Sequence, residues 1–168
     1  MEQKIIIKIN ELEKIIGFSL KFKNITLKSK ESHDESFSYG LSMRFYNKNN
    51  ELIKTIIKTK QLLYLVKKRK KSDKITIESL YSLIGNMYYI LGNYSISAGY
   101  FMKCITLNKK NITFWIELLF SLRAMGEFEL FEKGIFNLEK MILDWDKSSK
   151  KKKLNKNNFL KLIKKINN

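Results

Sequence analysis

The sequence predicts an all-α protein, and three observations lead to that fold class. Proline is absent from the 168 residues, whereas isoleucine and lysine are abundant, a composition that suits long helices because proline interrupts them. Apolar residues recur in several segments at the three- and four-residue spacing of an amphipathic helix. A segment between residues 81 and 105 also returns in altered form 34 residues later, so the chain is expected to repeat a helix hairpin.

The first expected helix covers residues 2–16, and Gly17 is its expected end because glycine commonly follows the last helical residue. Its apolar face consists of Ile5, Ile9, Leu12 and Ile16. Residues 18–28 alternate between apolar and polar side chains, and they are interpreted either as a short strand or as an extended packed segment. Residues 29–35 are expected to form a polar loop.

The remaining helices are expected to follow one another with short breaks. They cover about 35–46, 51–68, 75–91, 94–108, 112–125 and 128–143, and a short last helix covers 158–166. The break at 47–50, "NKNN", is an expected turn because asparagine caps helices and tolerates left-handed backbone geometry.

The internal repeat carries a recognisable pattern. Its first unit reads Tyr81-x2-Ile84-Gly85-x2-Tyr88, followed by Ser97-x3-Phe101. This pattern resembles the tetratricopeptide repeat (TPR), a helix–turn–helix of 34 residues that reads W-x2-L-G-x2-Y and then A-x3-F. The resemblance covers residues 78–111 and continues, with departures, over 112–143. It implies a short α-solenoid of TPR-like helix hairpins, with a divergent hairpin before them and N- and C-terminal helices that cap the ends.

Small residues in the repeat are expected at the helix turns and at close helix contacts. Gly92 and Gly126 fall at the turns, where a left-handed C-cap favours glycine. The residues expected at close contacts are Gly85, Ser97, Ala98 and Gly99. In the second unit the bulky Leu119 and Phe131 replace Gly85 and Ser97, and we expect them to push the two helices apart or to change their angle. Cys104 is expected to be a buried structural thiol.

Composition divides the chain into three expected parts. Residues 1–34 comprise the N-terminal helix and the extended or loop segment, 35–145 comprise the hairpins, and 146–168 comprise a basic linker with the short C-terminal helix.

The TPR resemblance implies a function as a non-enzymatic protein–protein interaction module, an adaptor or scaffold. Such arrays bind a partner segment in a concave groove lined by the first helix of each hairpin. By position in the repeat, that groove would be lined by Ser82, Asn86, Tyr89, Glu117, Phe120 and Arg123. This set has no lysine cluster and includes the acidic Glu117, so it favours a mixed aromatic and polar groove over a clamp for a peptide carboxylate.

The charge supports an alternative function as a basic RNA- or ribosome-associated protein. There are 33 basic and 16 acidic residues, giving a formal charge of +17, which suits nucleic acid, an anionic surface or an acidic peptide. The candidate residues are Lys67, Lys68, Arg69, Lys70, Lys71, Lys150, Lys151, Lys152 and Lys153. A lysine-rich composition without any functional role accounts for the same excess, and binding through these runs would be non-specific and salt-dependent.

Enzymatic activity, metals and cofactors are not expected. No glycine-rich phosphate loop, nucleophile elbow or pair of catalytic acids occurs, and the spacing around His33 matches no metal-ligand pattern. Residues 12–24 look like the opening of ribonuclease III domains, but the next helix contains Glu51 and then only lysines, so it lacks the carboxylates that would bind Mg²⁺. The short apolar run near the N-terminus predicts neither a signal peptide nor a membrane span, and a cytoplasmic location is expected.

Overall fold

A computed structural model describes residues 2–17, 41–69, 74–146 and 161. All regular secondary structure in these residues is helical, and they contain no strand. The prediction of an all-α protein is therefore confirmed for this part of the chain.

The helices lie close to their predicted positions. Their bounds are α1 Glu2–Ile16, α3 Asn49–Lys67, α4 Lys74–Ile90, α5 Tyr94–Leu107, α6 Ile112–Met125 and α7 Phe128–Asp146. Residues 41–44 are also helical, within the helix expected at 35–46. The expected extended segment at 18–28, the loop at 29–35 and most of the C-terminal helix lie outside the described residues, so these remain predictions.

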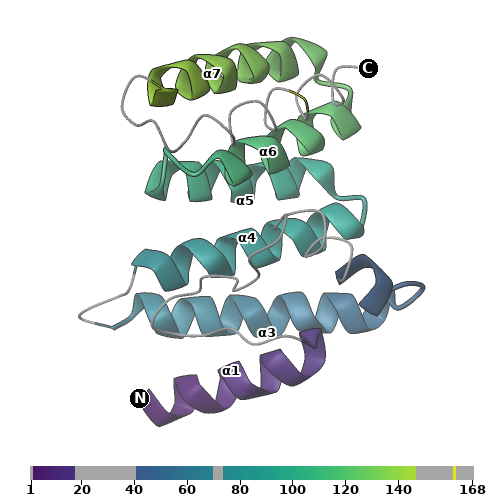
Figure 1. Cartoon of the computed structure of the whole chain (residues 1–168). Coiled ribbons are helices and arrows are strands. Elements are labelled where there is room, and N and C mark those ends of the chain that lie inside the picture. The colour runs from purple at the N-terminus through teal and green to yellow at the C-terminus, as the bar shows by residue number, and fades with distance from the viewer. Residues whose placement is uncertain (1, 18–40, 70–73, 147–160, 162–168) are drawn as a thin grey trace.

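Each helix packs against the next one along the chain. The packed pairs are α1 with α3, α3 with α4, α4 with α5, α5 with α6, and α6 with α7. Figure 1 shows the result, a stack in which chain order from the N-terminal helix to α7 is also the spatial order. Buried apolar side chains from all six helices form one continuous core. The predicted apolar face of α1 is confirmed, because Ile5, Ile9, Leu12 and Ile16 are all buried.

The two helix turns of the repeat have the same backbone geometry. Gly92 and Gly126 have φ values of 74° and 77°, in the left-handed region that favours glycine. After α4, the N–H of Gly92 donates to the carbonyl of Tyr89 and the N–H of Asn93 donates to that of Tyr88. After α6, Gly126 and Glu127 make the equivalent bonds to Arg123 and Leu122. Both turns are Schellman motifs, which confirms the predicted left-handed C-caps.

Close helix contact occurs at some of the predicted small residues. A Cβ atom on Gly85 of α4 would lie 3.0–3.2 Å from three ring atoms of Phe101 on α5, so only glycine lets the ring approach so closely. Ser97 of α5 is fully buried, and its Oγ lies 3.0 Å from the Oγ of Ser121 on α6. The prediction for Gly99 is wrong: this residue is exposed, and a Cβ there would meet nothing within 4 Å. It lies on the outer face of α5, where the repeat requires no small side chain.

The second hairpin uses the opposite arrangement of large and small residues. Leu119 of α6, which replaces Gly85, is fully buried. Its Cδ2 atom would lie 2.6 Å from a Cβ on Gly134 of α7. In the first hairpin the glycine is on the first helix and the large side chain on the second, and here the order is reversed. Because Gly134 has no side chain, it leaves space on α7 for the bulky Leu119 side chain of α6.

Candidate binding surfaces

The six predicted groove residues come from two helices. Ser82, Asn86 and Tyr89 lie on α4, and Glu117, Phe120 and Arg123 lie on α6. Within each helix the three residues are three or four positions apart, so they share one helical face. We call this set of six residues the α4–α6 face.

The residues of the α4–α6 face differ in accessibility. Asn86 and Glu117 are buried, and the Asn86 amide donates a hydrogen bond to the carbonyl of Ser82 in its own helix at 3.1 Å. Tyr89 and Phe120 are half-buried, and Arg123 is exposed. Contact with another molecule would therefore fall mainly to Tyr89, Phe120 and Arg123, because Asn86 and Glu117 are buried.

The surroundings of Tyr89 change the pKa of its hydroxyl group. Burial is the main cause that raises the pKa of the Tyr89 hydroxyl, and the charges of Tyr94 and Glu117 raise it further. The Tyr89 and Tyr94 rings lie 5.1 Å apart, centroid to centroid, tilted by 60°. Glu117 belongs to α6, so a charge from the second helix of this face also acts on Tyr89.

A second surface was not predicted from the sequence. It consists of three lysines from α3 and α5 and three tyrosines from α4 and α5, and we call it the lysine–tyrosine surface: Lys60, Lys67, Tyr81, Tyr88, Tyr100 and Lys103. Tyr81 is buried, and Tyr88 and Tyr100 are half-buried. The rings of Tyr88 and Tyr100 stack, with centroids 5.9 Å apart and an interplanar angle of 17°. Tyr81 also lies 5.9 Å from Tyr100, at 55°.

The three ammonium groups lie over these rings. The Lys60 Nζ donates a 2.7 Å hydrogen bond to the Tyr88 hydroxyl and is 5.0 Å from the centre of that ring. The Lys103 Nζ is 4.5 Å from the centre of Tyr100, and the Lys67 Nζ is 4.9 Å from that of Tyr81. These distances are within the range of cation–π attraction. The bond to Tyr88 raises the pKa of Lys60 above its ordinary value, so this lysine stays cationic at neutral pH.

The predicted basic segment is only partly described. Lys67 belongs to the lysine–tyrosine surface, the Lys68 Nζ lies 4.6 Å from the centre of the Tyr64 ring, and Arg69 is half-buried just after α3. The other candidates lie outside the described residues: Lys70, Lys71, Lys150, Lys151, Lys152 and Lys153.

The lysine–tyrosine surface was not predicted from the sequence because its three lysines are not consecutive residues. Lys60 and Lys103 are far apart in the sequence, and only the packing of α3 against α4 and of α4 against α5 brings both of them to the Tyr100 ring. One signal was present. Lys60 and Lys67 are seven residues apart, as are Tyr81 and Tyr88, and this spacing places each pair on one helical face.

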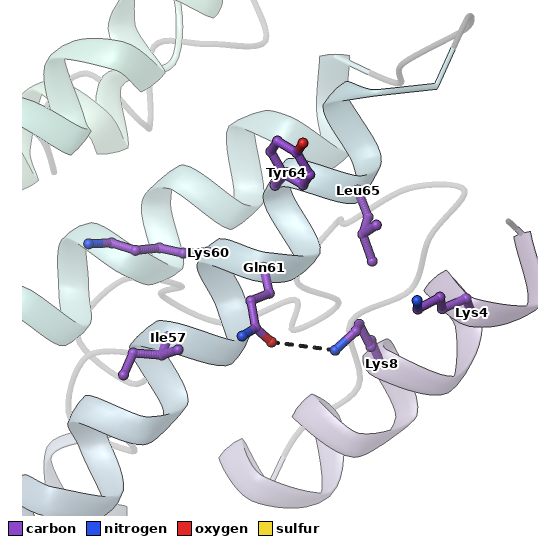
Figure 2. Close-up of a pocket in the computed structure, with 7 residues that line it drawn as sticks. All are labelled: Lys4, Lys8, Ile57, Lys60, Gln61, Tyr64 and Leu65. Carbon is purple, nitrogen blue, oxygen red and sulfur yellow. Dashed lines mark hydrogen bonds between the residues drawn. The ribbon is translucent and has the colours of Figure 1, made fainter.

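A cleft of about 460 Å³ lies between α1 and α3, and Figure 2 shows its lining side chains. α1 contributes two of them and α3 the other five: Lys4, Lys8, Ile57, Lys60, Gln61, Tyr64 and Leu65. The Lys8 Nζ donates to the Gln61 side-chain oxygen at 3.5 Å. The cleft therefore combines the ammonium groups of Lys4 and Lys8 with apolar walls, and none of its lining residues is acidic. Lys60 lines it with its side chain, while its ammonium group points away from Lys8 toward Tyr88 (Figure 2). We call this cleft the α1–α3 cleft.

Cys104 is the single cysteine, and its surroundings are those of a structural thiol. It is fully buried, and its Sγ lies 3.5 Å from the carbonyl oxygen of Glu78. Burial is the main cause that raises the pKa of the thiol far above its ordinary value. Because the thiolate is the reactive form, such a thiol is a poor nucleophile. The prediction that Cys104 is buried is confirmed.

The burial of Cys104 predicts its chemical behaviour. We expect the native thiol to react with iodoacetamide at least about 100-fold more slowly than an exposed one, because the reaction must wait for local opening of the structure. Full reactivity should return in urea. Rates can be followed by mass spectrometry, with Ser95→Cys in a Cys104→Ala background as the exposed reference on the same helix. Equal native rates for the two thiols would contradict the described burial.

Comparisons with protein-family models, curated proteins and solved structures find no match to this chain. Within the part of the chain that the structure describes, no helix is long and apolar enough to span a membrane. The same residues include no group of three or more His, Cys, Asp or Glu side chains arranged to hold a metal ion. The described residues thus form an all-helical structure with two surfaces and a cleft, at which aromatic and basic side chains are exposed beside apolar and uncharged polar ones.

Proposed function

We propose that this protein is a non-enzymatic, cytoplasmic interaction module built from TPR-like hairpins. The hairpins are α4–α5 and α6–α7, and α3 is the second helix of a divergent hairpin before them. The resemblance of residues 78–111 to the repeat supports this assignment, and so do the two matching turns at Gly92 and Gly126. The stacking of each helix on the next is also the arrangement that a short helical repeat would adopt.

The observation that carries the proposal is the shared face of α4 and α6. In a TPR-like array these would be the first helices of consecutive hairpins, which line the groove. Tyr89 and Phe120 are only half-buried there, although they are large apolar side chains, and the exposed Arg123 lies one helical turn beyond Phe120. We propose that this face holds a partner segment with an apolar side chain for the two rings and a carboxylate for Arg123.

The test is a pull-down from a cell extract that compares the partners retained by the purified wild type and by two purified variants. We expect Tyr89→Ala/Phe120→Ala to lose specific partners that the wild type holds, because truncating buried aromatic anchors of an interface commonly costs about 2 kcal/mol or more each. Tyr46→Ala/Phe136→Ala is the matched control, since it removes a tyrosine and a phenylalanine that are exposed elsewhere. Identical partner sets for wild type and the first variant would refute binding at the α4–α6 face.

A further inference from the structure

The lysine–tyrosine surface and the α1–α3 cleft share Lys60. Its ammonium group lies 5.0 Å from the centre of the Tyr88 ring and 6.0 Å from that of Tyr100, and the same side chain lines the cleft. Cationic groups thus continue from Lys4 and Lys8 on α1, through Lys60 on α3, to Lys103 on α5. These residues belong to four helices that stack in order in Figure 1.

This path has a net positive composition. Helices α1, α3, α4 and α5, which supply it, contain nine lysines and five acidic side chains. Three of the acidic residues belong to α1, and Glu51 lies in the first turn of α3. Glu78 accepts a hydrogen bond from the Asn108 side chain and lies next to buried Cys104. No acidic side chain lines the cleft in the described structure, so the path complements an extended anion.

The aromatic groups distinguish among anionic partners. An acidic peptide would pair with the lysines, but only its aromatic residues could stack on the exposed Tyr64 ring, which is 58% accessible at the edge of the cleft, whereas every nucleotide carries a planar base. Unpaired bases stack on aromatic side chains while lysines bind their phosphates. A base within a duplex cannot leave its stack to enter the cleft without the cost of unpairing.

We infer that the lysine–tyrosine surface and the α1–α3 cleft bind a single-stranded nucleic acid. Phosphates lie along Lys8, Lys60 and Lys103, and one unpaired base occupies the cleft beside Tyr64. The interaction does not depend on sequence, because lysine–phosphate contacts and base stacking are common to all bases. The residues involved are distinct from those of the α4–α6 face, so a test of this inference does not depend on the proposed protein groove.

The test measures binding of the full chain to a fluorescent oligouridylate of about 15 nucleotides by anisotropy. We expect Lys8→Gln/Lys60→Gln/Lys103→Gln to bind at least about tenfold more weakly at low salt, with a salt slope smaller by about 2 because three phosphate contacts are lost. The matched control, Lys109→Gln/Lys110→Gln/Lys140→Gln, removes the same charge from exposed positions outside the path. Equal weakening of the two triple variants would overturn the inference, because binding would then follow net charge alone.

A second pair of variants tests the cleft. We expect Tyr64→Ala to weaken oligouridylate binding about fivefold or more through lost stacking, whereas Tyr46→Ala, at another exposed tyrosine, leaves it unchanged. Duplex RNA of the same length, polyglutamate and phosphatidylserine vesicles serve as competitors, and each should compete more weakly than unlabelled oligouridylate at equal charge. An unchanged affinity for Tyr64→Ala would overturn the role of the cleft. Displacement by any of these three competitors as effective as that by unlabelled oligouridylate would overturn the assignment to a single-stranded nucleic acid.

Discussion

Replacing Phe101 with alanine is expected to lower the free energy of unfolding by about 3–5 kcal/mol, the usual cost of truncating a buried phenylalanine. Phe101 is fully buried, and its ring lies against the backbone of α4 at Gly85. Truncation would leave a cavity between α4 and α5, and the helix backbones cannot close it without losing their other contacts. Since domains of this size are typically stable by about 5–15 kcal/mol, much of the stability depends on this one ring.

The matched control for Phe101→Ala is Phe136→Ala, which makes the same chemical change on α7. Phe136 is 68% exposed, so its truncation should change the free energy of unfolding by no more than about 0.5 kcal/mol. Urea unfolding followed by far-UV circular dichroism gives both values. Similar losses in the two variants would contradict the described packing of α4 on α5, because they would show that burial of the ring does not determine its contribution.

The positions of the helices could be predicted from the sequence because local signals determine them. The apolar face of α1 follows from the spacing of its isoleucines, and the ends of α4 and α6 follow from Gly92 and Gly126, which repeat 34 residues apart. Each of these features depends on residues within one or two helical turns. No long-range contact is needed to recognise them.

The partners of each helix face were harder to predict, since they depend on rotation about the helix axis. Gly85 and Gly99 are both glycines within helical segments, yet Gly85 contacts Phe101 and Gly99 faces open space. The repeat pattern constrains the position of Gly85 but not that of Gly99. The repeat pattern does not predict a close contact at Gly134 either, because the first repeat has the bulky Tyr100 at the corresponding position.

The candidate surfaces also differ in whether local sequence or helix packing determines them. The α4–α6 face was assembled from positions in a repeat, and its joint use as a groove stays a prediction, with three residues on α4 and three on α6. Position alone did not predict that Asn86 and Glu117 would be buried. The lysine–tyrosine surface combines residues from three helices, and a search for charge runs along the chain cannot find such a cluster. Its recognition required the packing of α3 against the first hairpin.

The contact between Leu119 and Gly134 supplies the second large expected effect. Leu119→Ala should lower the free energy of unfolding by about 2–5 kcal/mol, because the side chain is fully buried between α6 and α7. Gly134→Ala should be neutral or modestly destabilising in the otherwise unchanged protein. The new methyl group gains about 1 kcal/mol of helix propensity, but its carbon would lie 2.6 Å from the Leu119 Cδ2, and such overpacking typically costs about 1–3 kcal/mol.

In the Leu119→Ala background the obstructing atoms are absent, so Gly134→Ala should stabilise the protein by about 1 kcal/mol through helix propensity alone. The two substitutions should therefore be non-additive by about 1–3 kcal/mol in a double-mutant cycle measured by urea unfolding. Gly99→Ala provides the control for propensity, since it adds the same methyl group to an open face of α5 and should not couple to Leu119. If Gly134→Ala had the same effect in both backgrounds, α6 and α7 would not meet through this pair, and the reversed placement of glycine and large side chain in the second hairpin would lose its physical basis.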